Sequence, residues 1–236
     1  LAGLIAVARR LSPALDIALT TNGRGLHEGA AALRRAGLNR VNVSLDTLDP
    51  DRYHDLTGGD LSAVLRGLGT ARRAGLRPIR INAVVLAGIN ADQLPEMARW
   101  ATAHGVELRF LEAMPIGGAA GFNRAHFVSA AEIVERFAHA FEVRSLGRAA
   151  GSTAHRYRLI GPGMDATVGL IAPVTRPFCG DCRRMRLTAD GRMFPCLQDS
   201  RCVSLGPLLS KDCDDAALWE AVLAGIADKP AAGSVQ

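Results

Sequence analysis

The stretch V-N-V-S-L-D, residues 41–46, decides the fold, because its side chains alternate in character. One predicted strand face is apolar and carries Val41, Val43 and Leu45, and the other is polar and carries Asn42, Ser44 and Asp46. A parallel strand covered by helices on both faces would be apolar throughout. The alternation therefore favours a barrel strand, with its apolar face under helices and its polar face toward a polar ligand.

The same alternation recurs in a later predicted strand, where Arg80 and Asn82 alternate with Ile79 and Ile81. In β/α barrels the reactive groups lie at the carboxyl ends of the strands. The candidates at these ends are Thr20, Thr21, Asn22, Ser44, Asp46 and Met114.

The first 115 residues repeat one unit, in which a helix ends at a glycine and a β-branched strand follows. We expect helices near residues 1–11, 25–36, 61–74 and 92–104, with left-handed glycines after three of them at Gly37, Gly75 and Gly105. We expect strands at residues 16–22, 40–46, 78–86 and 106–114. This order predicts an α/β fold built from parallel β/α units.

The pattern changes after Pro115. A glycine-rich loop at residues 117–121 precedes a capping box at 129–132, which predicts a helix to about residue 140. Residues 155–160 and 166–173 predict a β-hairpin, and a last helix is expected at 214–227. We therefore expect two domains, a partial barrel at residues 1–115 and a β-rich domain at 116–236.

The richest chemical signal is a C-x2-C-x13-C pattern within residues 178–196. Its cysteines are Cys179, Cys182 and Cys196. A hairpin of residues 185–188 and 193–196 around Asp190 and Gly191 would return the third thiolate to the first two. Iron–sulfur clusters normally take four ligands, so a cluster held by three would leave one iron open to a substrate.

A structural zinc site is the alternative reading of these cysteines. Zinc prefers four ligands, and Cys202 or Cys213 could complete the set. Arg183, Arg184 and Arg186 follow the second cysteine closely, and guanidinium groups suit a polyanion such as a nucleoside triphosphate. The arginines therefore favour a cluster that works beside a nucleotide.

Composition bounds the other possibilities. A chain of 236 residues that is 48% hydrophobic can bury a large core, and it has no run of 18 apolar residues that would predict a membrane span. Five cysteines, three of them in metal spacing, predict a reducing compartment, the cytoplasm. The net charge of +5 comes from scattered arginines with only 5% aromatic residues, which gives little support for specific nucleic-acid binding.

Four stretches together resemble a known family. They are T-T-N-G (20–23), R-V-N-V-S-L-D (40–46), R-F-L-E-A-M-P (109–115) and F-C-G-D-C-R-R-M-R-L-T-A-D-G (178–191). In order and separation they resemble the GTP 3′,8-cyclase (MoaA) family, radical S-adenosylmethionine lyases of molybdenum cofactor biosynthesis. The likeness implies the last four units of a partial (βα)6 TIM-like radical SAM barrel at 1–115. It also implies a C-terminal molybdenum cofactor synthesis domain with a second iron–sulfur cluster at 116–236.

The resemblance implies a role for each matching residue, although it identifies no catalytic residue. Cys179, Cys182 and Cys196 match ligands of the second 4Fe–4S cluster, whose open iron contacts the purine of GTP. Thr20, Arg80, Arg184, Met185 and Arg186 match GTP contacts, and Ser44 and Met114 match contacts to S-adenosylmethionine. Arg80 stands where the family usually has lysine, so a planar fork replaces a point charge.

The implied reaction begins at a first 4Fe–4S cluster, which reduces S-adenosylmethionine to a 5′-deoxyadenosyl radical. This radical abstracts hydrogen from C3′ of GTP, and C3′ attacks C8 to give (8S)-3′,8-cyclo-7,8-dihydroguanosine 5′-triphosphate. The product passes to a separate cyclic pyranopterin monophosphate synthase. This chain would contribute GTP positioning, and the sequence leaves a homodimer open.

Three family features do not occur in the sequence: the C-x3-C-x2-C motif of the first cluster, the G-G-E-P motif and the C-terminal Gly-Gly. We therefore expect a chain truncated by roughly two N-terminal β/α units, which as written cannot form the radical. A split or decayed gene product is the other account of these absences. Two rival functions also stay open, namely another radical enzyme with a C-terminal cluster and a non-catalytic remnant that binds GTP or zinc.

Overall fold

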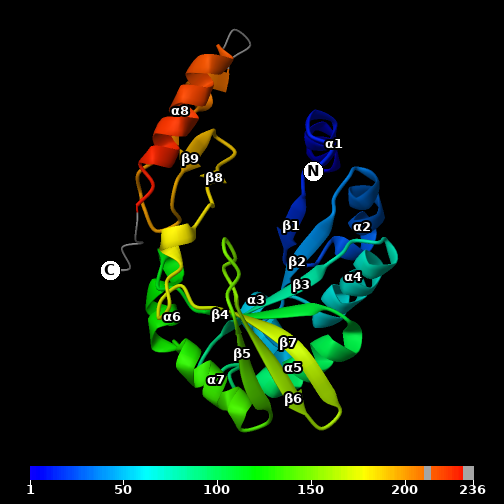
Figure 1. The fold of residues 1–236 in the computed structure, drawn as a ribbon. Coiled ribbons are helices and arrows are strands. Elements are labelled where there is room, and N and C mark those ends of the chain that lie inside the picture. Colours follow the sequence, from blue (N-terminus) through cyan, green and yellow to red (C-terminus); the bar gives the residue numbers. More distant parts are fainter. Residues whose placement is uncertain (210–213, 231–236) are drawn as a thin grey trace. The chain divides into compact units, whose positions relative to one another are not determined.

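The computed structural model describes residues 1–209 and 214–230, and the chain forms two compact units (Figure 1). Unit 1 comprises Leu1–Arg148 and Ala154–Ala172, and unit 2 comprises Ala149–Thr153 and the chain from Pro173 onward. The chain passes between the two compact units after residues 148, 153 and 172, whereas the predicted domain boundary follows residue 115. As a boundary between family domains, residue 115 stays a prediction.

Unit 1 is built on one mixed sheet. Its strands are β1 (Ala18–Thr21), β2 (Arg40–Ser44), β3 (Ile79–Val85), β4 (Glu107–Glu112), β5 (Glu142–Gly147), β6 (His155–Gly161) and β7 (Met164–Ile171). They pair in the order β1-β2-β3-β4-β7-β6-β5, with parallel pairing from β1 to β4 and from β4 to β7, and antiparallel pairing beyond. The predicted α/β class with a parallel core is confirmed.

The helices of unit 1 include the five predicted ones and two more, one of which begins within the predicted glycine-rich loop at residues 117–121. They are α1 (Ala2–Leu11), α2 (Leu26–Arg35), α3 (Pro50–Thr57), α4 (Leu61–Arg73), α5 (Leu94–His104), α6 (Ala120–Ala125) and α7 (Ala130–Ala138), with a short 3-10 turn η1 (Gly117–Ala119). The three expected left-handed glycines are confirmed, with φ of 108° at Gly37, 78° at Gly75 and 63° at Gly105. The capping box of α7 is also present, because Ser129 and Glu132 bond reciprocally.

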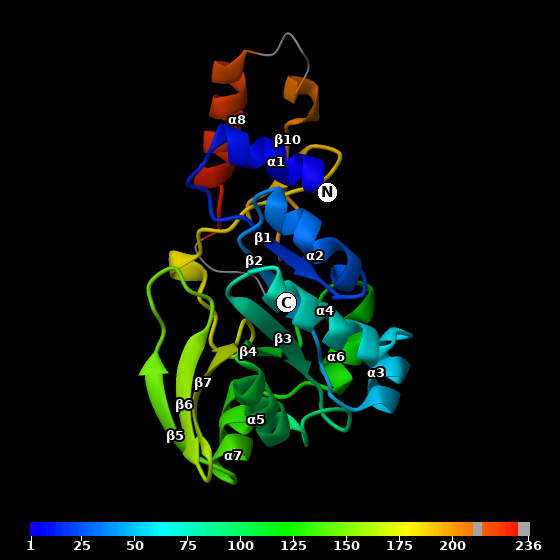
Figure 2. The ribbon, with the colours of Figure 1, turned by 90° about the vertical axis from the view of Figure 1, so that its right-hand side faces the viewer.

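The hydrophobic core lies between the sheet and the helices that cover one of its faces (Figures 1 and 2). Val41, Val43 and Leu45 are completely buried in it, as is Ile81 of β3. Each such side chain contributes roughly 1.5–3 kcal/mol by leaving water. The alternation predicted from residues 41–46 is therefore confirmed, and the opposite face of β2 and β3 carries the polar residues.

Helix α3 was not predicted, although its sequence has the usual helix boundaries. Asp49 caps it by accepting hydrogen bonds from the backbone N–H groups of Asp51 and Arg52, and Pro50 occupies its first turn. Gly58 ends it with a left-handed φ of 64°. Eight residues are too few for a clear hydrophobic period, which explains why the helix escapes a pattern search.

The β6–β7 hairpin was predicted correctly, but it belongs to the sheet of unit 1. Strand β7 pairs in parallel with β4, and Arg109 faces Gly169. A Cβ atom on Gly169 would lie only 3.1 Å from Cγ of Arg109. The glycine thus leaves room for the arginine stem, and the hairpin extends the sheet rather than the cysteine-bearing part of the chain.

Unit 2 holds a small antiparallel sheet of order β10-β9-β8. Its elements are η2 (Cys179–Asp181), β8 (Arg186–Leu187), β9 (Arg192–Phe194), β10 (Val203–Ser204), η3 (Gly206–Leu209) and α8 (Asp215–Ala227). The predicted hairpin around Asp190 and Gly191 is confirmed, with strands shorter than expected. The predicted last helix is confirmed as α8.

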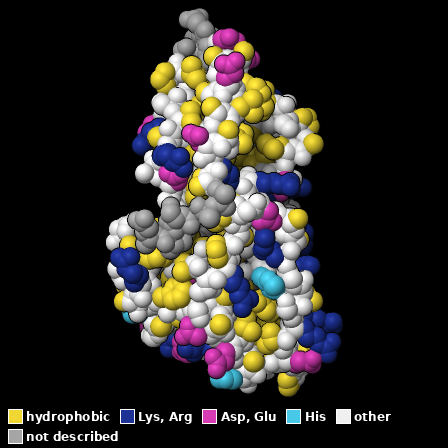
Figure 3. All heavy atoms as spheres, turned by 60° about the vertical axis from the view of Figure 1, so that its left-hand side comes forward, with side chains coloured by type: hydrophobic (Ala, Val, Ile, Leu, Met, Phe, Trp, Pro, Cys, Tyr) yellow, Lys and Arg dark blue, Asp and Glu magenta, His cyan; other side chains and the backbone are white. Residues whose placement is uncertain are grey.

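Helix α8 lies against this sheet at Gly225, where a Cβ atom would be 2.4 Å from Cε of Met193 and 2.9 Å from Cγ2 of Val203. Its exposed side carries Trp219, Leu223 and Ile226. Figure 3 shows hydrophobic side chains gathered on the surface of unit 2. Within residues 1–209 and 214–230, no helix has the length and apolar character to cross a membrane.

Candidate functional site

The polar face of the sheet in unit 1 aligns two of the predicted GTP contacts in one row. Thr20, Asn42, Arg80 and Glu107 are successive partners across β1, β2, β3 and β4. Nδ2 of Asn42 donates to Oγ1 of Thr20 at 3.2 Å, and Nε of Arg80 donates to Oε2 of Glu107 at 2.6 Å. Adjacent strands lie about 4.8 Å apart, so Thr20 and Arg80 stand about 10 Å from each other along this row.

A second row lies two residues nearer the carboxyl ends, and it contains a residue that the sequence analysis missed. Ser44, Asn82 and Arg109 are partners in this row. Burial lowers the pKa of Arg109, the positive charges of Arg80 and Arg40 lower it further, and Glu107 opposes the change. The alternation of E-L-R-F, residues 107–110, would have placed Arg109 on the polar face. This crowding of guanidinium groups suits an anionic ligand.

Two buried acceptors on the same face lack a hydrogen-bond partner among the residues that the structure describes. They are the side-chain carbonyl oxygens, Oδ1, of Asn42 and Asn82. A buried polar atom without a partner costs about 1–3 kcal/mol. A ligand with N–H or O–H groups would supply the missing donors.

The carboxyl ends of β2 and β3 are tied together by side chains. Backbone N–H of Val84 donates to Oδ1 of Asp46 at 2.7 Å, and Nδ2 of Asn90 donates to the carbonyl oxygens of Asp46 and Val84 at 2.7 and 2.8 Å. Burial raises the pKa of Asp46, and the hydrogen bond from Val84 partly opposes this. Ser44 therefore ends a strand whose exit is held in one conformation.

Met114 follows β4 and is half-buried. Its carbonyl oxygen accepts hydrogen bonds from Nδ2 of Asn123 at 2.7 Å and from N–H of Ile116 at 2.8 Å. Close by in the chain, the buried Glu112 accepts from N–H of Ala130 at the start of α7 at 2.8 Å. Helices α6 and α7 thus fix the loop that carries Met114, at the same end of the sheet as Ser44.

In unit 2, the three cysteines of the predicted cluster are half-buried, whereas Cys202 is exposed and Cys213 lies outside the described residues. Burial alone would raise the pKa of the Cys182 thiol, but hydrogen bonds from Arg184 and the charges of Arg184 and Lys229 together lower it. The thiolate is the form that binds metals. The lowered pKa raises the thiolate fraction of Cys182, which favours metal binding.

The predicted GTP-binding segment, residues 184–186, follows Cys182 in the chain and interacts with Cys182 and Cys196. The guanidinium of Arg184 lies 4.9 Å from the centre of the Phe178 ring. Burial lowers the pKa of Arg186, the positive charge of Arg184 lowers it further, and the negative charge of Cys196 and Cys182 in their thiolate form opposes this. Two arginines and two cysteines thus lie within electrostatic reach of one another, and Met185 between the arginines is exposed.

No group of three or more metal-binding side chains is already assembled within residues 1–209 and 214–230. Cysteine thiolates are the usual ligands of iron–sulfur clusters. The chemistry of the donor set therefore fits a cluster held by Cys179, Cys182 and Cys196, and the ligand assignment stays a prediction.

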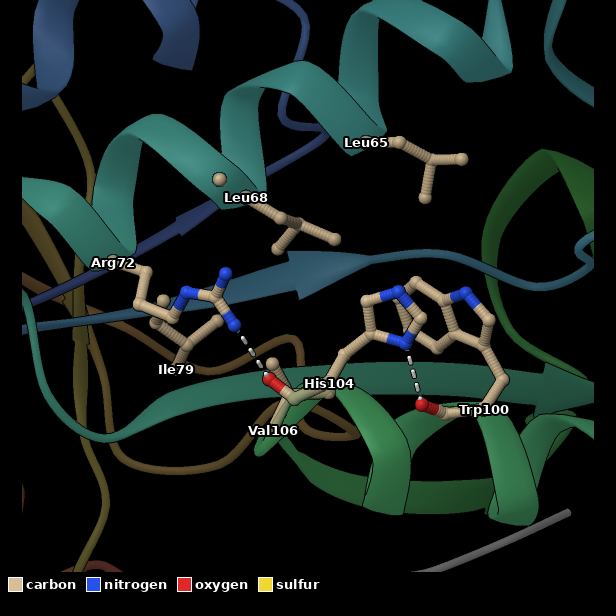
Figure 4. Close-up of a pocket in the computed structure, with 8 residues that line it drawn as sticks. Leu65, Leu68, Arg72, Ile79, Trp100, His104 and Val106 are labelled. Carbon is tan, nitrogen blue, oxygen red and sulfur yellow. Dashed lines mark hydrogen bonds between the residues drawn. The ribbon is translucent and has the colours of Figure 1, made fainter.

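A separate pocket lies on the helix-covered side of the sheet, between α4 and α5 (Figure 4). Most of its lining is apolar, and Trp100 stacks on His104 with ring centres 4.4 Å apart. Arg72 donates to the carbonyl oxygen of His104 at 3.3 Å. It contains none of the predicted site residues, because Ile79 points into it while Arg80 points to the other face.

Comparison with known proteins identifies both parts of the chain. The family model for Molybdenum Cofactor Synthesis C matches residues 106–235, and the model for the Radical SAM superfamily matches residues 2–101. GTP 3′,8-cyclase of Streptomyces coelicolor is 42% identical over 230 residues, which are 94% of this chain and 67% of that protein.

Two further relatives with the same name agree with this match. The protein of Alkaliphilus oremlandii is 44% identical and covers 78% of this chain and 57% of its own length. The protein of Paenarthrobacter nicotinovorans is 42% identical and covers 93% of this chain and 66% of its own length. The chain thus spans roughly 57–67% of the length of these curated relatives.

Proposed function

The chain belongs to the GTP 3′,8-cyclase family of the radical S-adenosylmethionine superfamily, and from this membership we propose that it binds GTP for 3′,8-cyclisation. This lyase reaction would be the first step of molybdenum cofactor biosynthesis. We also propose that the parallel strands β1 to β4 belong to a (βα)6 barrel, of which they are the last four units. The polar face that faces away from the helices supports this.

The observation that carries the proposal is the grouping of thiols and guanidinium groups in unit 2. Arg184 hydrogen-bonds the Cys182 thiol, and Arg186 interacts electrostatically with Cys182 and Cys196. A plain structural metal site has no need of two arginines beside its ligands. A site for a triphosphate beside a cluster does, because guanidinium groups bind phosphate oxygens through paired hydrogen bonds.

The residues of this chain would bind and orient the reactants. Cys179, Cys182 and Cys196 would hold a 4Fe–4S cluster, and Arg184, Met185 and Arg186 would contact GTP. S-adenosylmethionine with its own cluster supplies the radical chemistry when bound. What this chain adds is a fixed geometry for GTP, which lowers the entropic cost of bringing C3′ and C8 together.

The polar face of unit 1 offers polar groups of its own to a nucleotide and to S-adenosylmethionine. Thr20 offers a hydroxyl and Arg80 a guanidinium to GTP, and Ser44 and the Met114 loop would contact S-adenosylmethionine. We assign Oδ1 of Asn42 and of Asn82 as acceptors for hydroxyl or amino groups of a bound nucleoside, since both are buried acceptors without a partner in the described chain.

The test of the cluster is reconstitution with iron and sulfide under anaerobic conditions. We expect a brown protein with a broad absorption shoulder near ~400 nm. Cys196→Ser should abolish the colour, whereas Cys202→Ser, at an exposed cysteine, should retain it. A colourless protein that binds stoichiometric zinc would contradict the proposal.

The test of the nucleotide site is a calorimetric titration with GTP of the reconstituted chain. Arg186→Ala should weaken binding about tenfold or more, because a charge-assisted hydrogen bond contributes roughly 1.5–3 kcal/mol. Arg183→Ala is the matched control, since Arg183 lies outside the predicted GTP-binding segment, and it should bind like the unsubstituted chain. Equal small losses in both variants would mean diffuse electrostatics instead of a site.

A further inference from the structure

Lys229 follows α8 and reaches back to the cysteine hairpin. Its Nζ donates to the carbonyl oxygen of Arg184 at 2.5 Å and to that of Pro195 at 2.7 Å. Arg184 follows Cys182 by two residues, and Pro195 immediately precedes Cys196. One ammonium group therefore binds the backbone beside two of the three predicted cluster ligands.

The two carbonyl groups lie where the strand ladder has already ended. The register of β8 and β9 pairs Leu187 with Met193 and ends with Arg186 opposite Phe194. Residues 184 and 195 lie beyond this last pair, on the side of the hairpin that carries the cysteines. Lys229 thus joins the two strands at their open end, and an ammonium group, with three donors, can bind two carbonyl oxygens at once.

The docking of α8 brings the lysine to this place. Gly225 is buried against Met193 of β9 and Val203 of β10, where any side chain would clash. Lys229 comes four residues later, about one helical turn beyond the contact. The helix ends at Ala227, just before the lysine. The N–H group of the following residue, Asp228, donates to the carbonyl oxygen of Ala224. The close packing of α8 at Gly225 therefore places Lys229 within hydrogen-bonding distance of the two carbonyl oxygens.

We propose that Lys229 is a positioning residue for the cysteine hairpin. It closes the open end and holds the backbone beside Cys182 and Cys196 at one separation, so that both thiolates reach the same cluster. This inference rests on the proposed function for its ligand, the cluster. The two hydrogen bonds themselves belong to the chain without metal and can be tested there.

The first experiment measures amide hydrogen exchange in the metal-free whole chain. Lys229→Met removes both hydrogen bonds and keeps a long side chain, and we expect exchange across residues 183–198 to become about tenfold faster. Lys229→Arg should restore slow exchange, since a guanidinium group can also donate to two carbonyl oxygens. Gly225→Ala should speed exchange with the lysine intact, because α8 can no longer lie as close.

The second experiment measures iron release from the reconstituted chain to a chelator. Lys229→Met should release iron about tenfold faster than the unsubstituted chain, and Lys229→Arg should not. Arg201→Met is the matched control: it also loses one positive charge in unit 2, but the Arg201 guanidinium binds the Asp199 carboxylate. It should behave like the unsubstituted chain.

Three results would overturn the inference. They are unchanged exchange in Lys229→Met, an equal effect of Arg201→Met, and a failure of Lys229→Arg to restore what Lys229→Met loses. If the unsubstituted chain takes up no iron, the proposed function fails instead. The exchange experiment then decides alone whether Lys229 closes the hairpin.

Discussion

At the scale of single residues, Asp46 shows two physical effects that act in opposite directions on one carboxyl group. Burial disfavours its charge, whereas the hydrogen bond from N–H of Val84 favours it, and burial is the larger effect. The pKa of Asp46 in the folded chain is therefore raised above its usual value of 3.8. The folded state holds the proton more tightly than the unfolded state does.

This imbalance predicts how the stability of an Asp46→Asn variant depends on pH. Below the unfolded pKa the carboxyl group is protonated in both states, and as the pH rises through the folded pKa its ionisation lowers stability. Asparagine keeps an acceptor for Val84 without this loss. We therefore expect the variant to gain stability relative to the unsubstituted chain as the pH rises above the unfolded pKa, from about pH 4 upward.

Thermal unfolding at several pH values measures this difference. Asp55→Asn, at an exposed carboxyl group, is the control and should show little change. A difference between Asp46→Asn and the unsubstituted chain that stays constant over this range would contradict the argument.

At the scale of elements, a single side chain connects two strands. Asn90 is 1% exposed, accepts from N–H of Leu86 at 2.7 Å and donates to the carbonyl oxygens of Asp46 and Val84. These bonds hold the exits of β2 and β3 together. Strand ends that carry ligand contacts need this kind of support, because a loop alone would leave them in several conformations.

Replacement of Asn90 should therefore be costly. Asn90→Ala leaves one buried N–H and two part-buried carbonyl groups without the Asn90 amide, which predicts a loss of about 3 kcal/mol. Urea unfolding measures the free energy. Ser62→Ala is the control, because Ser62 is exposed and its hydroxyl bonds only exposed groups, and it should change stability by less than about 0.5 kcal/mol. A similar small loss in Asn90→Ala would mean that water replaces the amide.

Elements that depend on local pattern could be predicted, and those that depend on distant partners could not. Strand β2 and the glycine after α5 follow from alternation and backbone conformation. The position of β7 beside β4 depends on Gly169 accommodating Arg109, a contact between residues 60 positions apart in the sequence. The same holds for the candidate site. Alternation within the strands predicts that Thr20 and Arg80 lie on one face of the sheet, but no local pattern predicts that Lys229 binds the cysteine hairpin.

At the scale of the whole molecule, positive charge dominates. The net charge is +5, and the predicted ligand GTP carries several negative charges. Guanidinium groups occur on the polar face of unit 1, at Arg80 and Arg109, and in the hairpin of unit 2, at Arg184 and Arg186. Such groups attract phosphate oxygens. Attraction of this kind is screened by salt, more strongly where the groups are exposed, as Arg184 is.

GTP affinity should therefore fall severalfold between about 50 and 300 mM salt, while the affinity for guanosine changes little. Calorimetric titrations of the reconstituted chain with both ligands measure this. Guanosine is the matched control, since it has the same base and ribose without the triphosphate. A GTP affinity that does not depend on salt would indicate recognition through the base alone.

The strand order of unit 1 also governs how the chain folds as it leaves the ribosome. Strand β4 pairs with β3 on one side and with β7 on the other. Of the strands in this sheet, β7 is synthesised last, after β5 and β6. Until then one edge of β4 is open, and open strand edges pair readily with the wrong partner. The parallel part of the sheet therefore gains its last strand only when residues 164–171 have been synthesised.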